Sequence, residues 1–493
     1  MKTSFNPFRD GELDAAVPTT ASQKEIFSSC LADPQAALAF NEGIELEFSG
    51  PLQRVALERA LIELAKRHES LRANFDRRGM FACIAGSPRL DFDVVTDADQ
   101  YSVEEQRAAL VRHVFDLQQD VLWRVVLVQQ SDDQHTVFLL FHHIVVDGWS
   151  MAVLLEELEA LYNASLNEVE AQLEPPKSFV DYALHESRGH GNADASHWLE
   201  KFATLPAPLD LPLDRGRPEF RTFGARRLDV LFSRDLIDPF TRAGGRQGAT
   251  LVASFLSALF LQLRQLTGQD DLILGMAVAG QLDGDFQSLV GHCVKMLPVR
   301  QQVPANASFA ELVPSVKEAV MDAYEHQSFT FAELVRQLNV PRDAARIPLI
   351  PVVFNIDQEF AGIELDGLTC RLRTLPRVAE NFEVFFNFLP GPDGVLLEAT
   401  FNTDLFDEAT VRGWIDGLKR SLILISEQPE LPLDQWAPPE SANSTVGPDV
   451  AVGSALPLDL HEVLVSSTGS VVYEGSELSG AELDLRARRI GSA

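Results

Sequence analysis

Two adjacent histidines, followed at short spacing by an aspartate and a glycine, are the residues with the clearest chemical potential in this sequence. His142 and His143 precede Asp147 and Gly148. A neutral imidazole accepts a proton near neutral pH, and a nearby carboxylate with a tight glycine turn is a common way to fix its orientation. The spacing therefore favours a proton-transfer site, against the simpler reading of one buried structural histidine beside an incidental neighbour.

Regular structure is expected on both sides of this motif. The apolar run Thr136 to Phe141 predicts a buried strand directly before the histidines, beside a second strand at Trp123 to Val128. The apolar spacing of Met151 to Leu161 predicts a helix after them, with Ser150 as a candidate N-cap. The motif is thus predicted to lie on a loop from a strand to a helix.

The whole chain predicts a layered α/β (α+β) protein of two lobes. Its 493 residues are too many for one compact core, and helical and strand patterns alternate throughout. Further helices are expected at 56–66 and 251–266, and further strands at 227–232, 272–279, 349–355, 382–389 and 395–402.

Composition shifts suggest domain boundaries. Glu174-Pro175-Pro176-Lys177 interrupts the pattern, which predicts an N-terminal lobe at 1–175 and a C-terminal lobe at 176–430. The stretch 431–457 has the Pro, Ser and Gly content of a linker, and 458–493 is too short to bury a core of its own.

Charge and composition argue against several function classes. The net charge of −31 would repel a polyphosphate backbone, so no nucleic-acid partner is expected. No window has the apolar length of a membrane span, and the first residues lack a secretory signal, which predicts a cytoplasmic protein without a membrane partner. The four cysteines show no metal-ligand spacing, and no metal site is expected.

The string from His142 to Ser150, His-His-Ile-Val-Val-Asp-Gly-Trp-Ser, resembles the core motif of nonribosomal peptide synthetase condensation domains. Other segments of residues 15–430 resemble that family in its order. They are Ala21-Ser22-Gln23, Arg67-His68-Glu69-Ser70-Leu71-Arg72, Phe179-Val180-Asp181-Tyr182, Val290-Gly291-His292, Leu297-Pro298-Val299-Arg300, His326-Gln327-Ser328-Phe329, Pro348-Leu349 and Phe401-Asn402-Thr403-Asp404-Leu405-Phe406.

The resemblance implies two chloramphenicol-acetyltransferase-like lobes in a V with a central tunnel. It implies an acyltransferase that moves a carrier-bound acyl group from its thioester to an acceptor amine, forming an amide in nonribosomal peptide or hybrid polyketide biosynthesis. The implied partners are a donor acyl or peptidyl carrier protein and an acceptor carrier protein or soluble acceptor. Phosphopantetheine arms would arrive on the carriers, with no cofactor bound by the chain, which would be monomeric or part of a larger synthetase.

The same resemblance assigns roles within the motif. His143 would activate or position the acceptor amine, and His142 would be structural. Asp147 would be architectural, paired with Arg72 or, as the weaker candidate, with Arg67, because a buried carboxylate without a partner is costly.

Further residues are candidates for the tunnel. Gly148 would provide a special backbone conformation and an amide N–H near the reacting carbonyl. Trp149, Ser150, His292 and Lys295 would lie along the tunnel, and Lys295 stands where the family commonly has asparagine. Ser150 is not expected to be a nucleophile, since no Gly-x-Ser-x-Gly elbow is present and direct transfer fits better.

Alternatives remain open at this point. One is a free-standing condensation-type acyltransferase that forms an ester or amide with a soluble alcohol or amine. Another is a catalytically silent member that recruits other enzymes. The segment 458–493 resembles the start of an adenylation domain, and Val353 to Asp357 resembles condensation domains that follow polyketide modules.

Overall fold

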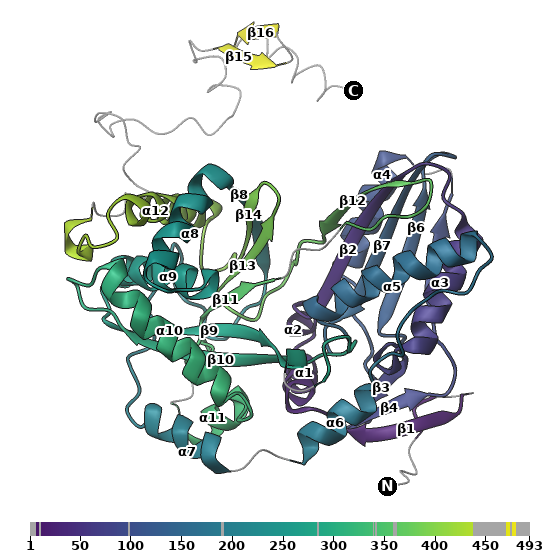
Figure 1. The fold of residues 1–493 in the computed structure, drawn as a ribbon, viewed down its shortest axis with the longest axis horizontal. Helices are drawn as coiled ribbons and strands as arrows, with labels where there is room; N and C mark the ends of the chain where they lie inside the picture. The colour runs from purple at the N-terminus through teal and green to yellow at the C-terminus, as the bar shows by residue number, and fades with distance from the viewer. Residues whose placement is uncertain are drawn as a thin grey trace. The chain divides into compact units, whose positions relative to one another are not determined.

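A computed structural model describes most of the chain (Figure 1). The chain divides into two units, Met1–Glu440 and Ser441–Ala493. The described residues are 6–8, 11–96, 99–188, 192–282, 285–338, 340, 343–357, 362–436, 470–473 and 476–479.

A five-stranded sheet is the centre of the first lobe of the larger unit, with strand order β12-β2-β7-β6-β5. Its strands are β12 (Thr369–Thr374), β2 (Asn41–Ser49), β7 (Gln134–His142), β6 (Trp123–Gln129) and β5 (Asp91–Val95). The inner strands β6 and β7 are mostly buried, as expected for β-branched and aromatic residues covered on both faces.

Helices and a small sheet complete this lobe. The helices are α1 (Ala21–Ala32), α2 (Pro34–Leu38), α3 (Arg54–Arg67), η1 (Glu69–Arg72), α4 (Gln100–Leu110), α5 (Gly148–Leu166) and α6 (Phe179–Ser187). The small sheet has the order β1-β4-β3, with β1 (Leu13–Pro18), β4 (Phe81–Ala85) and β3 (Ala73–Phe75). Helices α3 and α5 lie side by side on one face of the large sheet (Figure 1), so α3 packs along the helix that begins at the motif.

A six-stranded sheet is the centre of the second lobe, with strand order β10-β9-β11-β13-β14-β8. Its strands are β10 (Val294–Gln302), β9 (Asp271–Ala279), β11 (Val352–Ile356), β13 (Val384–Gly391), β14 (Gly394–Asn402) and β8 (Ala225–Ser233). The remaining elements are α7 (Asn192–Lys201), α8 (Arg234–Arg246), α9 (Leu251–Thr267), η2 (Gly280–Leu282), α10 (Phe309–Glu325), α11 (Phe331–Gln337), α12 (Glu408–Glu427) and η3 (Leu433–Gln435). Helix α9 is apolar around its circumference, because α8, α10 and α12 enclose it.

The two lobes exchange segments. Strand β12 follows β11 of the second lobe in the chain, yet it pairs antiparallel with β2 of the first lobe. Residues Leu289, Val290 and Cys293 also belong to the first hydrophobic core. The single boundary predicted between 175 and 176 therefore does not describe the lobes, because strand addition depends on tertiary pairing that composition does not reveal.

The predicted elements around the motif are confirmed as β6, β7 and α5, and the predicted hairpin at 382–402 is β13 with β14.

Among the described residues no single helix is long and apolar enough to cross a membrane, but the pair α8 and α9, bent by 99°, passes that test by length and composition together. In the smaller unit, β15 (Ser470–Tyr473) and β16 (Ser476–Ser479) form an antiparallel hairpin. Most of the predicted linker and of the adenylation-like segment lies outside the described residues.

Candidate active site

The motif occupies the turn between β7 and α5. Strand β7 ends at His142, and α5 begins at Gly148 with Asp147 as its N-cap. The backbone N–H of Ser150 donates to Asp147 Oδ1 at 2.8 Å. The prediction that Ser150 caps the helix is wrong, because the aspartate carboxylate satisfies the first turn and suits the positive end of the helix dipole.

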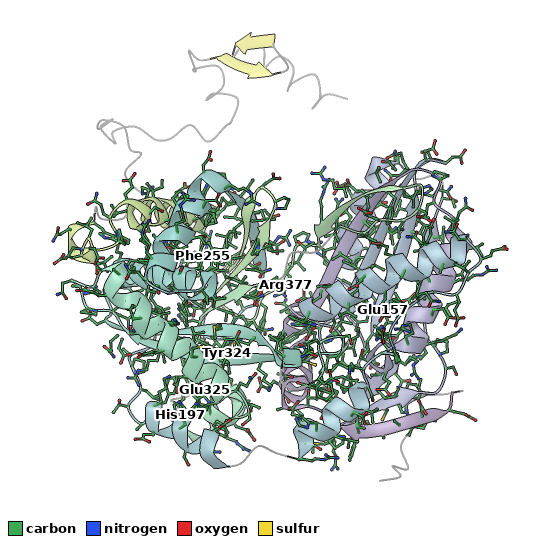
Figure 2. All side chains as sticks on the ribbon, in the orientation of Figure 1. Glu157, His197, Phe255, Tyr324, Glu325 and Arg377 are labelled. Atoms are coloured by element: carbon green, nitrogen blue, oxygen red, sulfur yellow. The ribbon has the colours of Figure 1, made fainter. Side chains whose placement is uncertain are left out.

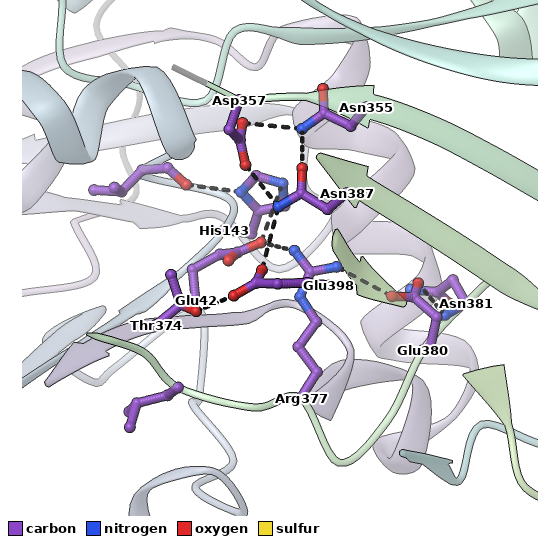
Figure 3. Close-up of polar contacts among 12 residues, drawn as sticks. Glu42, His143, Asn355, Asp357, Thr374, Arg377, Glu380, Asn381, Asn387 and Glu398 are labelled. Carbon is purple, nitrogen blue, oxygen red and sulfur yellow. Dashed lines mark hydrogen bonds and ion pairs between the residues drawn. The ribbon is translucent and has the colours of Figure 1, made fainter. Parts of the chain in front are cut away.

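His143 presents one ring nitrogen to a cavity. Its backbone N–H donates to the Phe40 carbonyl at 2.7 Å, and its Nδ1 lies 2.8 Å from the Val146 carbonyl oxygen. A carbonyl only accepts, so Nδ1 carries the hydrogen and the neutral ring keeps its lone pair on Nε2. Nε2 lies 3.8 Å from Glu42 Oε1 (Figure 3), which leaves it the basic atom of the site.

His142 faces away from the cavity into the first core. Its Nδ1 accepts from the Ile144 N–H at 3.2 Å, and its Nε2 lies 3.7 Å from Cys30 Sγ. Burial, and then the charge of His143, lower the pKa of His142 to about 3. A ring that is buried and neutral supports the loop, in line with the structural role expected for it.

His292 packs against the basic histidine from the other side. Its ring centroid lies 4.6 Å from that of His143 in an edge-to-face arrangement, and it lines the cavity. Burial first, and then the charges of His143 and His142, hold the pKa of His292 well below its usual range. His292 is therefore a neutral wall beside the base.

Asp147 is completely buried and is satisfied by neutral donors. Besides the Ser150 backbone, the Ser150 hydroxyl donates to Oδ1 at 2.6 Å. The Gln281 amide and the Cys293 backbone N–H each donate to Oδ2 at 2.9 Å. This carboxylate ties the motif loop to two segments of the second half of the chain, 280–282 and 291–293.

The two arginines expected to pair with the motif carboxylate do not contact it. Arg72 donates to the Ala85 carbonyl and lies 3.8 Å from Asp14 Oδ2. Arg67 Nε donates to Glu157 Oε2 at 2.7 Å and so joins α3 to α5. The predicted pairing is wrong because amide and hydroxyl donors already satisfy the carboxylate, and no guanidinium has to be desolvated beside it. Arg67 supports the motif only through the helix that follows it.

Gly148 lines the cavity at the N-terminus of α5. Its φ is not positive, so the prediction that this glycine provides a special backbone conformation is wrong. Space is the reason for glycine instead, because a Cβ here would lie 3.1 Å from Asp357 Oδ1. Its N–H belongs to the first helical turn, where amide groups have no acceptor within the helix.

The other predicted tunnel residues divide into two groups. Trp149 and Lys295 line the cavity, and the Trp149 ring N–H donates to the Gln287 carbonyl at 2.6 Å. Ser150 is buried away from it, where its hydroxyl accepts from the Gly291 N–H at 3.0 Å. Ser150 therefore joins two segments, and its assignment to the tunnel is wrong.

The cavity is large and is shared by both lobes. Its volume is about 1280 Å³. The first lobe contributes His143 and Gly148 to its walls, and the second contributes Lys295, Asp357 and Asn387. The cavity thus lies where the two lobes meet, with His143 in its wall.

Sequence reasoning missed a polar cluster at the end of β11. The Asn355 amide donates to Asp357 Oδ1 and the Asn387 amide donates to Asp357 Oδ2, both at 2.9 Å (Figure 3). Burial raises the pKa of Asp357 to about 6 despite these bonds. The available signal was the polar pair Asn355 and Asp357 at the end of an apolar strand.

A second missed cluster joins the lobes. Arg377 donates to Glu42 Oε1, and its Nη1 lies 3.1 Å from Glu380 Oε2 (Figure 3). Burial disfavours the charged guanidinium, but the two carboxylates outweigh that cost and raise the pKa of Arg377 above its ordinary value. The separation of 335 positions from Glu42 to Arg377 explains why no local pattern predicted this contact.

Comparison with known proteins identifies the class. The family model for the condensation domain matches residues 15–444, and the chain belongs to this family of acyltransferases. It is 29% identical to surfactin synthase subunit 1 of Bacillus subtilis (strain 168) over 92% of this chain and 13% of the relative. It is 27% identical to tyrocidine synthase 3 of Brevibacillus parabrevis over 99% of this chain and 8% of that relative. The chain thus spans less than a fifth of the length of these two relatives.

Solved structures support the fold. The condensation domain of the monacolin K polyketide synthase MokA matches with a TM-score of 0.75 and 20% identity, over 86% of this chain and all of that one. The X-domain in its complex with OxyB from teicoplanin biosynthesis matches with a TM-score of 0.74 and 25% identity, over 86% and 97% of the two chains. The predicted chloramphenicol-acetyltransferase-like fold is confirmed.

Proposed function

We propose that this chain joins a carrier-bound acyl group to the amine of an acceptor held by a second carrier protein, with His143 as the residue that receives the proton. One observation carries the proposal: His143 is held by its Nδ1 on the Val146 carbonyl and lines a cavity of about 1280 Å³ whose walls come from both lobes, so Nε2 is the ring nitrogen left for the reaction. Phosphopantetheine arms delivered by the two carriers would bring the reactants together there.

In this reaction the acceptor nitrogen attacks the thioester carbonyl carbon, a C–N bond forms and the C–S bond breaks. The proton of the nitrogen passes to His143 Nε2 and then to the departing thiolate of the donor arm. The N–H of Gly148, at the positive end of α5, is suited to stabilise the carbonyl oxygen as it gains charge. Most of the acceleration would come from holding two tethered reactants at contact distance.

Mass spectrometry of the carrier proteins tests the proposal. The full chain is mixed with an acyl-loaded donor carrier and an aminoacyl-loaded acceptor carrier, and the expected result is transfer of the acyl mass to the acceptor carrier. The control replaces the acceptor by the same carrier without its amino acid. Product that forms only with soluble amines or alcohols, and never on the acceptor carrier, would contradict the proposal.

A further inference from the structure

Glu42 is the carboxylate that faces the basic nitrogen of the site. Its Oε1 lies 3.8 Å from His143 Nε2, and the same oxygen accepts from Arg377. Strand β2 carries Glu42, and the Leu375 N–H donates to the carbonyl of the next residue, Gly43, at 2.8 Å. The position of this carboxylate therefore depends on both β2 and the segment that leaves β12.

The charges around Arg377 do not balance while the histidine is neutral. Its guanidinium serves the carboxylates of both Glu42 and Glu380. Burial raises the pKa of Glu380, whereas Arg377 and the Asn381 N–H, which donates at 2.8 Å, favour its carboxylate form. Two carboxylates thus share one guanidinium, and a proton on His143 would supply the missing positive charge.

The other ionisable groups near the base are less able to supply that charge. Glu398, on β14, is paired with Arg227 of β8 at 3.1 Å. Asp357, at the end of β11, adds further negative charge once it ionises. Lys295 enters the cavity wall from β10 with an interaction of its own.

The two neighbouring histidines do not supply it either. Burial lowers the pKa of His142 to about 3 and is also the largest cause that holds the pKa of His292 well below its ordinary range. Both rings stay neutral around neutral pH. Glu42 is therefore the group with the most direct electrostatic effect on Nε2 of His143.

We propose that Glu42 is a positioning residue that stabilises the imidazolium of His143 and so sets the strength of this base, with Arg377 moderating the effect. The inference rests on the proposed function of His143. As the acceptor amine attacks and its proton moves to Nε2, the nearby carboxylate stabilises the new cation. When the proton passes on to the departing thiolate, the network returns to its starting charge.

The test uses the full chain and the isosteric variant E42Q, whose amide oxygen can still accept from Arg377. Because an opposite charge about 4 Å away favours the protonated ring, we expect the pKa of His143 to fall by about one unit in E42Q. The acid limb of the pH–rate profile should move to lower pH by the same amount, and the plateau rate should fall about three- to tenfold because the base is weaker. The pKa is measured by NMR of histidine-labelled protein, with the signal assigned by its loss in H143Q.

Two variants serve as controls. E47Q removes the charge of another glutamate of β2. Glu47 lies farther along the strand from the motif, with its Oε1 2.8 Å from Arg373 Nη2 of β12. This variant should change neither the pKa of His143 nor the pH–rate profile. E42D keeps the charge and should restore most of the wild-type pKa. A third variant, R377Q, removes the competing cation and should move the pKa of His143 upward, opposite to E42Q.

The outcomes separate the two proposals. Unchanged His143 pKa values in both E42Q and R377Q, in variants that melt as the wild type does, would overturn the role of Glu42. If E42Q does not fold, the upward shift expected in R377Q decides the question alone. Full activity of H143Q would instead overturn the proposed function, while the NMR shift would still report on Glu42.

Discussion

Two histidine pairs in this chain invite comparison, one in the wall of the cavity and one half-buried at the surface beside α7. His143 meets His292 edge to face at 4.6 Å, whereas His197 of α7 stacks flat on His326 at 3.7 Å. Figure 2 labels His197 on α7 and Arg377 between the lobes. In the surface pair, Asp322 Oδ2 lies 3.1 Å from His197 Nε2.

The difference lies in how the nearby carboxylate is neutralised. At the surface, Lys201 lies 2.5 Å from Asp322 Oδ2 and supplies a full positive charge. In the cavity, Glu42 shares its arginine with a second carboxylate, so the histidine itself can complete the charge balance. Under the proposed function, two features separate His143 from His197: a carboxylate whose charge is not fully balanced and a place in the cavity wall.

Removing each histidine should give the largest contrast. H143Q removes the proton acceptor, and general-base catalysis contributes about 10²–10⁴-fold, so we expect amide formation to fall by at least about 100-fold. H326Q, the matched surface change, should keep the rate within about twofold. Initial rates of acyl transfer between loaded carriers measure both, and comparable losses in the two variants would remove the distinction between the pairs.

The two aspartates should differ next in their effect on folding. D147N replaces one carboxylate oxygen by an NH₂ group that faces hydrogen-bond donors in a fully buried network. This change should lower the free energy of unfolding by about 3 kcal/mol. D322N leaves a partly exposed site, and its cost should stay below about 1 kcal/mol. Urea denaturation followed by circular dichroism measures both. A D147N protein as stable as D322N would show that the motif network is not structural.

Asp357 and Asp322 should give pH dependences of opposite sign. Burial raises the pKa of Asp357 to about 6, so the folded protein binds this proton more tightly than the unfolded chain does. Its contribution is complete below about pH 4 and is lost as the pH rises through about 6. The free energy of unfolding should therefore fall less between about pH 4 and 7 in D357N than in the wild type, by up to about 3 kcal/mol. Denaturation at each pH measures this difference.

For Asp322, burial raises the pKa, but Lys201, His197 and His326 together outweigh it and leave the pKa below its ordinary value. The stability it contributes is present above the unfolded pKa and is lost as the pH falls. D322N should remove a small loss of stability on the acid side and leave the range above about pH 5 unchanged. The same slope in D322N and D357N would contradict the proposed contrast.

Metal addition should give the smallest effect. The ring nitrogens of His197 and His326 and a carboxylate oxygen of Asp322 lie within 4.8 Å of one another, as a metal site would require. However, the stacked rings cannot both point their lone pairs at one ion, and Lys201 already holds the carboxylate. Excess Zn²⁺ should shift the melting temperature by less than about 1 °C. A larger shift that disappears in H197Q would show a site there.

Local patterns predicted what local physics decides. The two strands before the motif are apolar and the helix after it has regular apolar spacing, so β6, β7 and α5 were predictable from short windows. The motif also identified His143, because the ring is oriented within its own loop, where Nδ1 donates to the Val146 carbonyl.

Contacts between distant segments could not be predicted in this way. Gln281 and Cys293 satisfy Asp147 from 134 and 146 positions away, and an arginine was expected instead because a buried carboxylate suggests a charged partner. Glu42 carried no signal because one acidic residue at the start of a strand is usually solvated. The cavity itself arises only when both lobes are folded.

Strand β12 leads directly into the segment that carries Arg377, and it is hydrogen-bonded to the strand that carries Glu42. One of the segments that connect the lobes thus also supports the electrostatic environment of the base. A shift of β12 relative to β2 would therefore displace Arg377 from Glu42 and change the charge that faces Nε2 of His143.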